Sequence, residues 1–179
     1  MGMETDVYVF AREADPELVG ELEEGTHEEV RFVASTTGAF AAFAVVEIAD
    51  LETLPQTLRS IFGNPGATGL ETAVPILWGP SQLRWTKQYP YIAFSRIRSR
   101  PGRAMDVLAG TAVVPGYNGS AIVAGGGYDV LVEFGAHEED ELRDRLLHGL
   151  HAVKGVAWSD TAIVARYYYR GPKSKAASA

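Results

Sequence analysis

The fold of this chain is decided by a stretch of sequence that occurs twice. Residues 125–134 read GGGYDVLVEF and residues 37–46 read TGAFAAFAVV, so an aromatic residue follows a glycine-containing turn and opens an apolar run both times. An apolar run after such a turn is typical of a β-strand that leaves a hairpin. The recurrence predicts an internal repeat, which constrains the whole fold.

The similarity extends to both sides of this stretch. Apolar residues at helical spacing follow each copy, and the second of these helices begins with a run of acids that suits the positive end of its dipole. A single inserted residue then explains a small change in offset between the copies. The matched segments are 9–12 with 93–96, 51–62 with 139–150, and 66–74 with 155–163.

Each copy predicts the order strand, helix, strand, strand, helix, strand. In the second copy the elements are expected at 91–97, 103–110, 118–124, 128–134, 138–151 and 157–167. The apolar face of its second helix is expected to comprise Leu142, Leu146, Leu147 and Leu150. The first copy has a weaker first helix, within residues 15–25. This order is the ferredoxin-like plan, so the predicted fold class is α+β, with two ferredoxin-like (β-α-β-β-α-β) repeats in one chain.

The repeat also predicts how the chain is divided. Residues 1–77 form a diverged first repeat and residues 91–169 form the second. The aromatic, proline-bounded segment 78–90 connects them and is too apolar for a free linker, so we expect it to pack across the junction. Residues 170–179 are small, basic and without periodicity, which predicts a frayed tail.

Composition excludes several classes of function. The chain has 179 residues, of which 46% are hydrophobic and 22% charged, as in an ordinary globular protein. It has no cysteine, which excludes disulfides and thiolate chemistry, and its net charge of -7 argues against nucleic-acid binding. No apolar run is long enough for a membrane helix and the start is acidic, so we expect no membrane partner and a cytoplasmic location.

The second repeat resembles the ligand-binding (RAM) domain of the Lrp/AsnC family, the leucine-responsive and AsnC transcription regulators. The resemblance lies in Pro101-Gly102 after the first strand, in Gly127-Tyr128-Asp129 before an apolar strand, in the acidic start of the following helix, and in Gly155-Val156 before residues 160–164. The first repeat looks like a diverged copy. The family domain pairs between two chains, so the resemblance implies an intramolecular dimeric α/β barrel here.

The resemblance also implies a function. Family members carry an N-terminal helix-turn-helix, whereas this chain is expected to enter a strand at about Asp6. We therefore expect a stand-alone regulatory protein that binds a small, amino-acid-like effector without contacting DNA itself. Its expected partners are that effector and either further copies of itself or a full-length regulator of the family. An enzymatic role is not expected.

Six residues are the candidate effector contacts that the resemblance implies. Glycines in the Gly127-Tyr128-Asp129 turn expose backbone N–H groups that can hold a carboxylate, while Asp129 could accept hydrogen bonds from an ammonium group. Ser159, Asp160 and Thr161 on the last strand are weaker candidates. The alternative is that the turn serves only its hairpin. In the first repeat Ala41 replaces the acid, which predicts that only one half keeps a site.

Two alternatives remain from the histidines and the fold. His148 and His151 lie three residues apart on one predicted helix, where Asp144 or Glu141 could complete a metal site. Because related barrels host haem-handling proteins and cofactor-free monooxygenases, an enzyme or a haem-handling protein (monooxygenase-like or chlorite-dismutase-like) is the competing interpretation. We predict no cofactor or metal, with haem as the alternative. The sequence shows no phosphate loop and no Ser-His-Asp pattern, so the enzyme interpretation rests on fold analogy alone.

Two further clusters attract structural interpretations. Arg96, Arg98 and Arg100 share one face of a strand, where they could bind an anionic ligand or pair with acids of the other repeat. Residues 167–169 are three consecutive tyrosines, which could stack on nucleic acid. Alternation along a strand sends Tyr168 to the opposite face from its neighbours, so packing at the strand end is the better interpretation.

Overall fold

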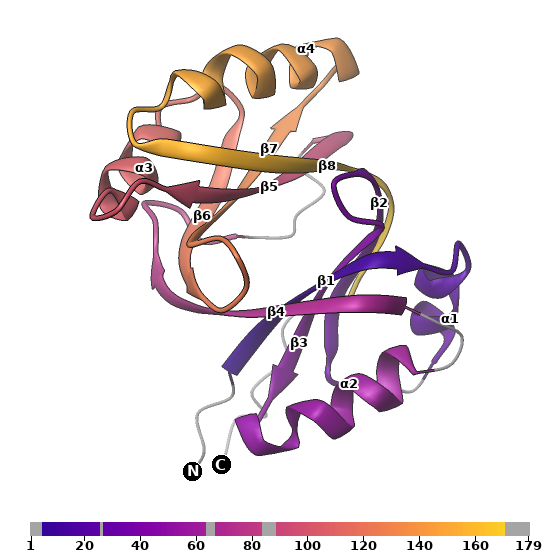
Figure 1. The fold of residues 1–179 in the computed structure, drawn as a ribbon. Coiled ribbons are helices and arrows are strands. Elements are labelled where there is room, and N and C mark those ends of the chain that lie inside the picture. Colours follow the sequence, from indigo (N-terminus) through magenta and orange to yellow (C-terminus); the bar gives the residue numbers. More distant parts are fainter. Residues whose placement is uncertain (1–4, 26, 64–66, 84–88, 171–179) are drawn as a thin grey trace, which may run out of the picture.

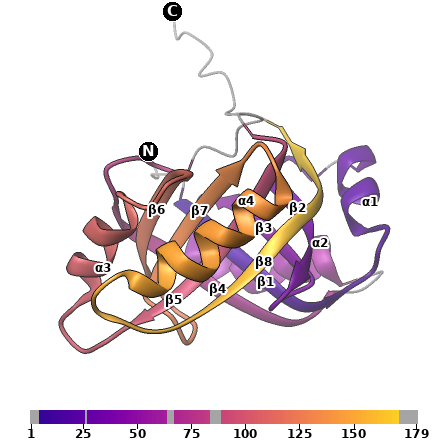
Figure 2. The ribbon, with the colours of Figure 1, turned by 90° about the horizontal axis from the view of Figure 1, so that it is seen from above.

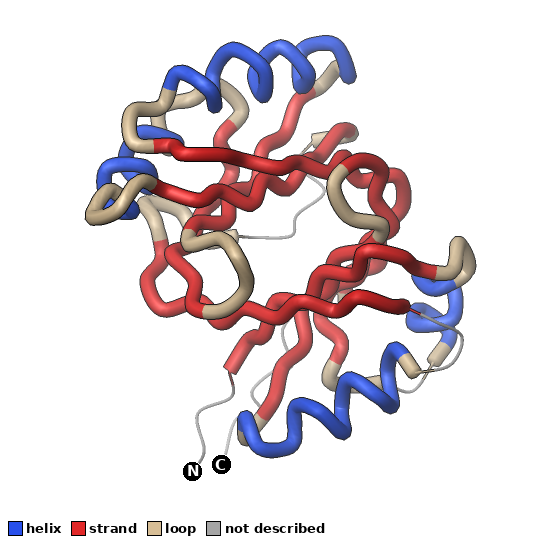
Figure 3. The backbone as a smooth tube through the Cα atoms, in the orientation of Figure 1, coloured by secondary structure: helices blue, strands red, loops and turns tan. Residues whose placement is uncertain are grey.

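The strands of this protein close into an eight-stranded antiparallel barrel with the helices outside it (Figure 1, Figure 3). The computed structural model describes residues 5–25, 27–63, 67–83 and 89–170. The strands are β1 (Thr5–Ala14), β2 (Val30–Gly38), β3 (Ala42–Ile48), β4 (Ala67–Trp78), β5 (Tyr91–Ser99), β6 (Tyr117–Ala124), β7 (Val130–Ala136) and β8 (Val156–Tyr169). The α-helices are α1 (Leu18–Glu24), α2 (Leu54–Phe62), α3 (Ala104–Thr111) and α4 (Glu139–Asp144). The chain is therefore α+β, as predicted.

Two long strands join the halves of the barrel. The strand order is β1-β3-β2-β8-β5-β7-β6-β4, closing from β4 back to β1. Strand β4 pairs with β1 over Ala67–Ala73 and with β6 over Val74–Trp78. Strand β8 pairs with β5 over Val156–Ile163 and with β2 over Ala162–Tyr169. Each half therefore supplies one strand that crosses to the other.

Strands β3 and β7 read as nearly continuous apolar runs because both of their faces are buried. Alternation along β1 sends Tyr8 and Phe10 into the barrel and Val7 and Val9 toward the helices. One apolar core fills the barrel, and two more lie between the barrel and the helices. Seen from above, α4 lies over strands of the second half while α1 and α2 lie beside the first (Figure 2).

The strand register corrects one expected match between the halves. Phe10 lies opposite Phe43 and Glu71, whereas Arg96 lies opposite Leu131 and Asp160. Since those neighbours correspond to one another in the two halves, Arg96 corresponds to Phe10 and not to Arg12. The error is two residues, which leaves every side chain on the same face of the strand. Periodicity therefore cannot detect it.

The second helix of the second half also differs from expectation. Its α-helical part ends at Asp144, and a wider π-turn, Arg145–Gly149, and a 3-10 turn, Leu150–Ala152, continue it. Leu142 and Leu150 are buried as predicted, but Leu147 is 61% exposed. No helix in the described residues is long and apolar enough to span a membrane.

The connector and the tyrosines have described contacts. Leu83 is buried in the core of the barrel, and the backbone N–H of Ser120 donates to Ser81 (3.0 Å). Residues 84–88 of the expected connector and 171–179 of the expected tail lie outside the described residues. Tyr167 stacks on Phe32 inside the barrel at 5.8 Å, whereas Tyr168 packs on the helix side. The alternation predicted for these tyrosines is confirmed.

Two glycines allow the long strands to approach their neighbours closely. Gly38 has φ +124°, and a Cβ there would lie 2.6 Å from the carbonyl oxygen of Thr161. Gly125 repeats this arrangement with φ +112°, its Cβ position lying 2.5 Å from the carbonyl oxygen of Thr72. Both junctions between the halves are therefore built in the same way.

Replacing Gly38 with alanine is expected to lower the free energy of unfolding by at least about 2 kcal/mol. The change adds left-handed strain and a clash with backbone that cannot move without opening the β2–β8 junction. Gly102→Ala is the matched control, because Gly102 has φ +73° but open space around its Cβ position. Urea denaturation of both variants measures the difference, and equal losses would show that the close approach is unimportant.

Candidate functional site at the end of the barrel

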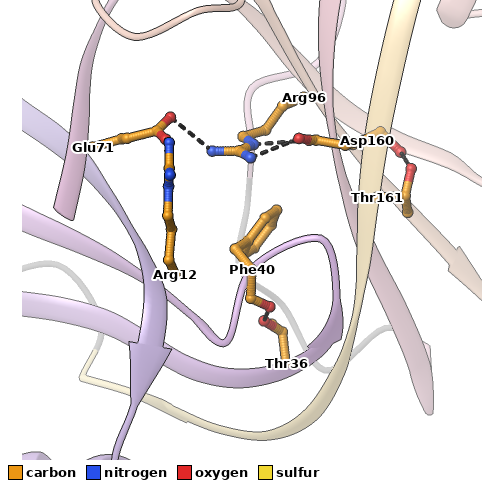
Figure 4. A network of polar contacts seen from close by, with 8 residues as sticks. Arg12, Thr36, Phe40, Glu71, Arg96, Asp160 and Thr161 are labelled. Carbon is orange, nitrogen blue, oxygen red and sulfur yellow. Dashed lines mark hydrogen bonds and ion pairs between the residues drawn. The ribbon is translucent and has the colours of Figure 1, made fainter. Parts of the chain in front are cut away.

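A buried arginine is the centre of a polar cluster at one end of the barrel. Arg96 follows Phe94 on the inward face of β5, and its side chain is only 9% exposed. Its Nε and Nη2 donate to the two carboxylate oxygens of Asp160 on β8, at 2.8 and 2.6 Å. Its Nη1 donates to Glu71 on β4 at 3.1 Å. The ion pairs thus link both halves of the chain (Figure 4).

Aromatic rings surround the same guanidinium. The Cζ atom of Arg96 lies 5.1 Å from the ring centroid of Phe10, 4.9 Å from that of Phe40 and 5.2 Å from that of Tyr128. Such contacts attract a cation through the negative face of the ring. The hydroxyl of Thr36 donates to the carbonyl of Phe40 (2.6 Å) and helps to hold its turn in place.

A pocket of about 390 Å³ opens beside this cluster, and we refer to it as the barrel-end pocket. Its lining residues are Arg12, Glu71, Arg96, Gly126, Gly127, Tyr128, Trp158 and Asp160. Arg12 is 74% exposed and donates to Glu71 at 3.1 Å. Two guanidinium groups and two carboxylates therefore face one pocket, and their formal charges cancel.

Burial and neighbouring charge set the protonation of the cluster. Burial lowers the pKa of Arg96, but the hydrogen bond and charge of Asp160 and the charge of Glu71 outweigh it and raise that pKa overall. Burial raises the pKa of Tyr128, Arg96 lowers it, and the two acids raise it further, so the phenol has a pKa above its ordinary value. At neutral pH the tyrosine is a hydrogen-bond donor and the arginine is charged.

The hydroxyl of Tyr128 is the unusual group in the site. Tyr128 is only 5% exposed, and its hydroxyl oxygen has no hydrogen-bond partner among the described residues. Buried polar groups are nearly always paired, since an unpaired one costs about 1–3 kcal/mol. The Tyr128 hydroxyl therefore keeps an unused donor beside the charged cluster.

The six residues expected from the sequence do not form a single site. Gly127, Tyr128 and Asp160 line the barrel-end pocket. Asp129 lines a neighbouring pocket of about 310 Å³ together with Gly127 and Tyr128. Its carboxylate accepts hydrogen bonds from the backbone N–H of Ser99 (2.8 Å) and from the Ser99 hydroxyl.

Alternation along β8 separates the other candidates. Ser159 and Thr161 point to the opposite face of the strand from Asp160 and line a groove beneath α4. There the Thr161 hydroxyl lies 2.7 Å from that of Ser95. Three consecutive strand residues cannot share one pocket, so the structure divides this set between two faces.

Sequence reasoning missed Arg12, Glu71 and the ring of Phe40 as members of the site. The signal that pointed toward Glu71 was the arginine run on β5, for which pairing with acids of the other repeat was one interpretation. Arg96 confirms that interpretation through Glu71. Arg98 is different, because it donates to the backbone carbonyl of Gly127 (3.2 Å).

The histidines considered as metal ligands lie on the outer surface. The Nε2 atom of His148 is 3.6 Å from Asp144, with both side chains at least 75% exposed. His151 lines the groove beneath α4. Among the described residues, no three histidine or acidic side chains come together as a metal-binding group.

Comparisons with known proteins show the fold. No family model and no curated protein matches the chain. The siroheme decarboxylase NirDL, solved with an iron-uroporphyrin III analogue, has a TM-score of 0.69 over 93% of this chain and 73% of its own, at 7% identity. An anthrone oxidase-like protein has a TM-score of 0.53 and 16% identity over 99% of this chain and 97% of its own.

A smaller match covers only part of the chain. The protein TTHA0845 from Thermus thermophilus is 28% identical over 45% of this chain and 99% of its own, with a TM-score of 0.41. The longer matches place the chain among α+β proteins with the dimeric α/β barrel fold. At such low identity they carry no information about its ligand or reaction.

Proposed function

We propose that this chain binds a small zwitterion, an amino acid or a close analogue, in the barrel-end pocket. The observation that carries the proposal is the pairing of two guanidinium groups with two carboxylates around one pocket. A ligand carboxylate would take free N–H groups of Arg12 and Arg96, while its ammonium group would take free lone pairs of Glu71 and Asp160.

Charge and size support a zwitterion over a simple ion. Because the four lining charges cancel, a neutral molecule with two opposite charges disturbs the balance least. Adding a lone anion or cation would leave one unit of uncompensated charge beside the aromatic rings of Phe10, Phe40 and Tyr128. The volume of about 390 Å³ lies at the small end of the range for small-molecule sites, roughly 300–1,000 Å³.

In this proposal Tyr128 completes the site by donating its hydroxyl to the ligand. Tyr128→Phe is therefore expected to raise the free energy of unfolding of the ligand-free protein by about 1 kcal/mol, because it removes an unpaired buried hydroxyl. The same change should weaken ligand binding. Thermal denaturation with and without ligand measures both effects.

Tyr117→Phe is the matched control for that substitution. The Tyr117 hydroxyl lies 2.9 Å from the Ser120 hydroxyl and donates to the Ser81 carbonyl (3.3 Å), so its removal should cost about 1 kcal/mol. If Tyr128→Phe destabilises the free protein as Tyr117→Phe does, the Tyr128 hydroxyl has a partner within the protein and the proposed role is wrong.

We further propose that the chain is an effector-binding regulatory protein of the Lrp/AsnC type. Support comes from the sequence resemblance of 91–164 and from the β-α-β-β-α-β order of elements in each half. On this proposal residues 1–77 and 91–169 are two copies of one ferredoxin-like unit, joined by 78–90. Ligand binding would then act through association with further copies or with a full-length regulator.

A thermal-shift screen tests the proposed function. The purified protein is heated with each amino acid and with the matching des-amino acid and amine. A true ligand at about 100 times its Kd adds roughly 2.7 kcal/mol to the free energy of unfolding. One amino acid should therefore raise the Tm clearly, whereas its des-amino acid and its amine should not. If no amino acid shifts the Tm, or if a des-amino acid shifts it equally, the zwitterion proposal fails.

The haem-handling or enzymatic alternative has one observation in its favour. His151 lines the groove beneath α4 among leucine side chains, so its imidazole could serve there as a ligand of haem iron. The absorption spectrum of the purified protein and a haem titration test this alternative. A Soret band that His151→Ala abolishes would favour it over the regulatory proposal.

A further inference from the structure

A second cavity lies on the outer side of the barrel, between the second helix of the second half and strand β8. This groove, of about 450 Å³, is formed by the helical segment from Arg143 to His151, by β8 and by the end of β2. We refer to it as the α4 groove. The barrel-end pocket lies on the other face of β8, since Asp160 points there while Ser159 and Thr161 point here.

The wall of the groove is aliphatic and partly open to solvent. Leu146, Leu147, Leu150 and Ile163 contribute to it, and Leu147 is 61% exposed although it belongs to the apolar side of the helix. Exposing a large apolar side chain to water is unfavourable by an amount that grows with its area. A ligand with an apolar body would cover this surface.

The helix is irregular at this position. The π-turn Arg145–Gly149 includes Leu146 and Leu147, and such turns are rare and frequently found at functional sites. Gly149 within it approaches Val114 so closely that a Cβ would lie 2.6 Å from the Val114 Cγ1. The irregularity and the exposed leucine therefore lie on the same wall of the groove.

The polar groups of the groove define the kind of head group it accepts. Arg143 and His151 lie on the helix side, and the hydroxyl residues Thr37, Ser159 and Thr161 lie on the strand side. None of the described residues that line the groove is acidic. Arg143 pairs with Glu139 at 2.6 Å but is 59% exposed, so its remaining N–H groups face solvent. These groups are donors that suit a carboxylate.

We infer that the α4 groove binds an amphipathic monocarboxylate. Its aliphatic or aryl body lies against Leu146, Leu147 and Ile163, and its carboxylate lies at Arg143 and His151. This ligand differs in class from the zwitterion of the barrel-end pocket, and the inference does not depend on that proposal.

Calorimetric titration of the full chain with octanoate tests the inference, with octanol and octylamine as comparisons. Octanoate should bind more tightly than either, and each added methylene from hexanoate to decanoate should tighten binding by about fourfold. Arg143→Gln should weaken octanoate at least fivefold while leaving octanol unchanged. Octylamine that binds as tightly as octanoate would overturn the assigned head group.

Substitution of the exposed leucine localises the site. Leu147→Asp places a carboxylate in the groove at a solvent-exposed position and should weaken octanoate at least tenfold. Leu51→Asp is the matched control, since Leu51 is 54% exposed and lies elsewhere on the surface. Octanoate binding that is absent from the wild type, or equal in both variants, would overturn the inference. The inference would also be overturned if the wild type bound haem but not octanoate, and if Leu147→Asp abolished that haem binding.

Discussion

Replacing Arg96 with alanine is expected to lower the free energy of unfolding by roughly 3 kcal/mol. The substitution leaves Asp160 and Glu71 without their shared cation, and breaking a buried ion pair from one side costs about 3–5 kcal/mol. The lower end applies because these two carboxylate side chains are 29% and 27% exposed. The cation–π contacts with three rings are lost as well.

Arg12→Ala is the control for this prediction. Arg12 also pairs with Glu71, but its side chain is 74% exposed, so the loss should stay below about 1 kcal/mol. Arg96→Lys should fall between them, since lysine keeps the charge but cannot reproduce the two-point contact with Asp160. Urea denaturation measures all three, and equal losses for Arg96→Ala and Arg12→Ala would contradict the central place given to Arg96.

Phe94→Ala is expected to lower the free energy of unfolding by about 3–5 kcal/mol. Unfolding should remain a single transition. Phe94 belongs to the second half and is fully buried, yet its ring lies 4.6 Å from that of Phe43 and 5.8 Å from that of Phe32, both of the first half. Because the two halves share these rings in one core, damage on one side should destabilise both.

Far-UV circular dichroism and tryptophan fluorescence follow this unfolding with independent probes. Coincident curves for the wild type and for Phe94→Ala are expected. Ile76→Ala is the control, because Ile76 is apolar but 65% exposed and should cost little. Two separate transitions, of which only one moves in Phe94→Ala, would show that the halves fold independently and that the shared core contributes little.

The closed barrel illustrates what the repeat could predict. Elements were foreseeable because apolar periodicity and glycine turns are local signals, and the observed bounds of β5 to β7 lie within about two residues of the predicted ones. Pairing of β2 with β8 and of β4 with β6 is not local. It depends on how Gly38 and Gly125 let a strand of one half approach the other.

The candidate site was foreseeable only in part. The Gly127-Tyr128-Asp129 turn is where family resemblance placed a ligand, and the turn does reach the barrel-end pocket. Tyr128 enters the barrel, whereas the carboxylate of Asp129, just before β7, is held by Ser99. Pairing with an acid of the other repeat was one interpretation, but which acid pairs with Arg96 could not be inferred, since the contact with Glu71 crosses the barrel.

The α4 groove was beyond sequence reasoning for a related reason. Regular helical spacing predicts that Leu147 joins Leu142, Leu146 and Leu150 on one buried face. A π-turn breaks that spacing, and the local leucine pattern does not predict the π-turn. The same departure from regularity creates the exposed apolar wall on which the second binding proposal rests.

The most direct test of the barrel-end pocket is calorimetric titration of the best-shifting amino acid into the wild type, Arg96→Lys and Asp129→Asn. Arg96→Lys should weaken binding at least tenfold, because it loses the two-point geometry that positions Asp160 and the free N–H groups. Asp129→Asn should bind like the wild type, since Asp129 is engaged with Ser99. Unchanged binding in Arg96→Lys together with loss of binding in Asp129→Asn would contradict this proposal. That result would show that the ligand binds at the Gly127-Tyr128-Asp129 turn.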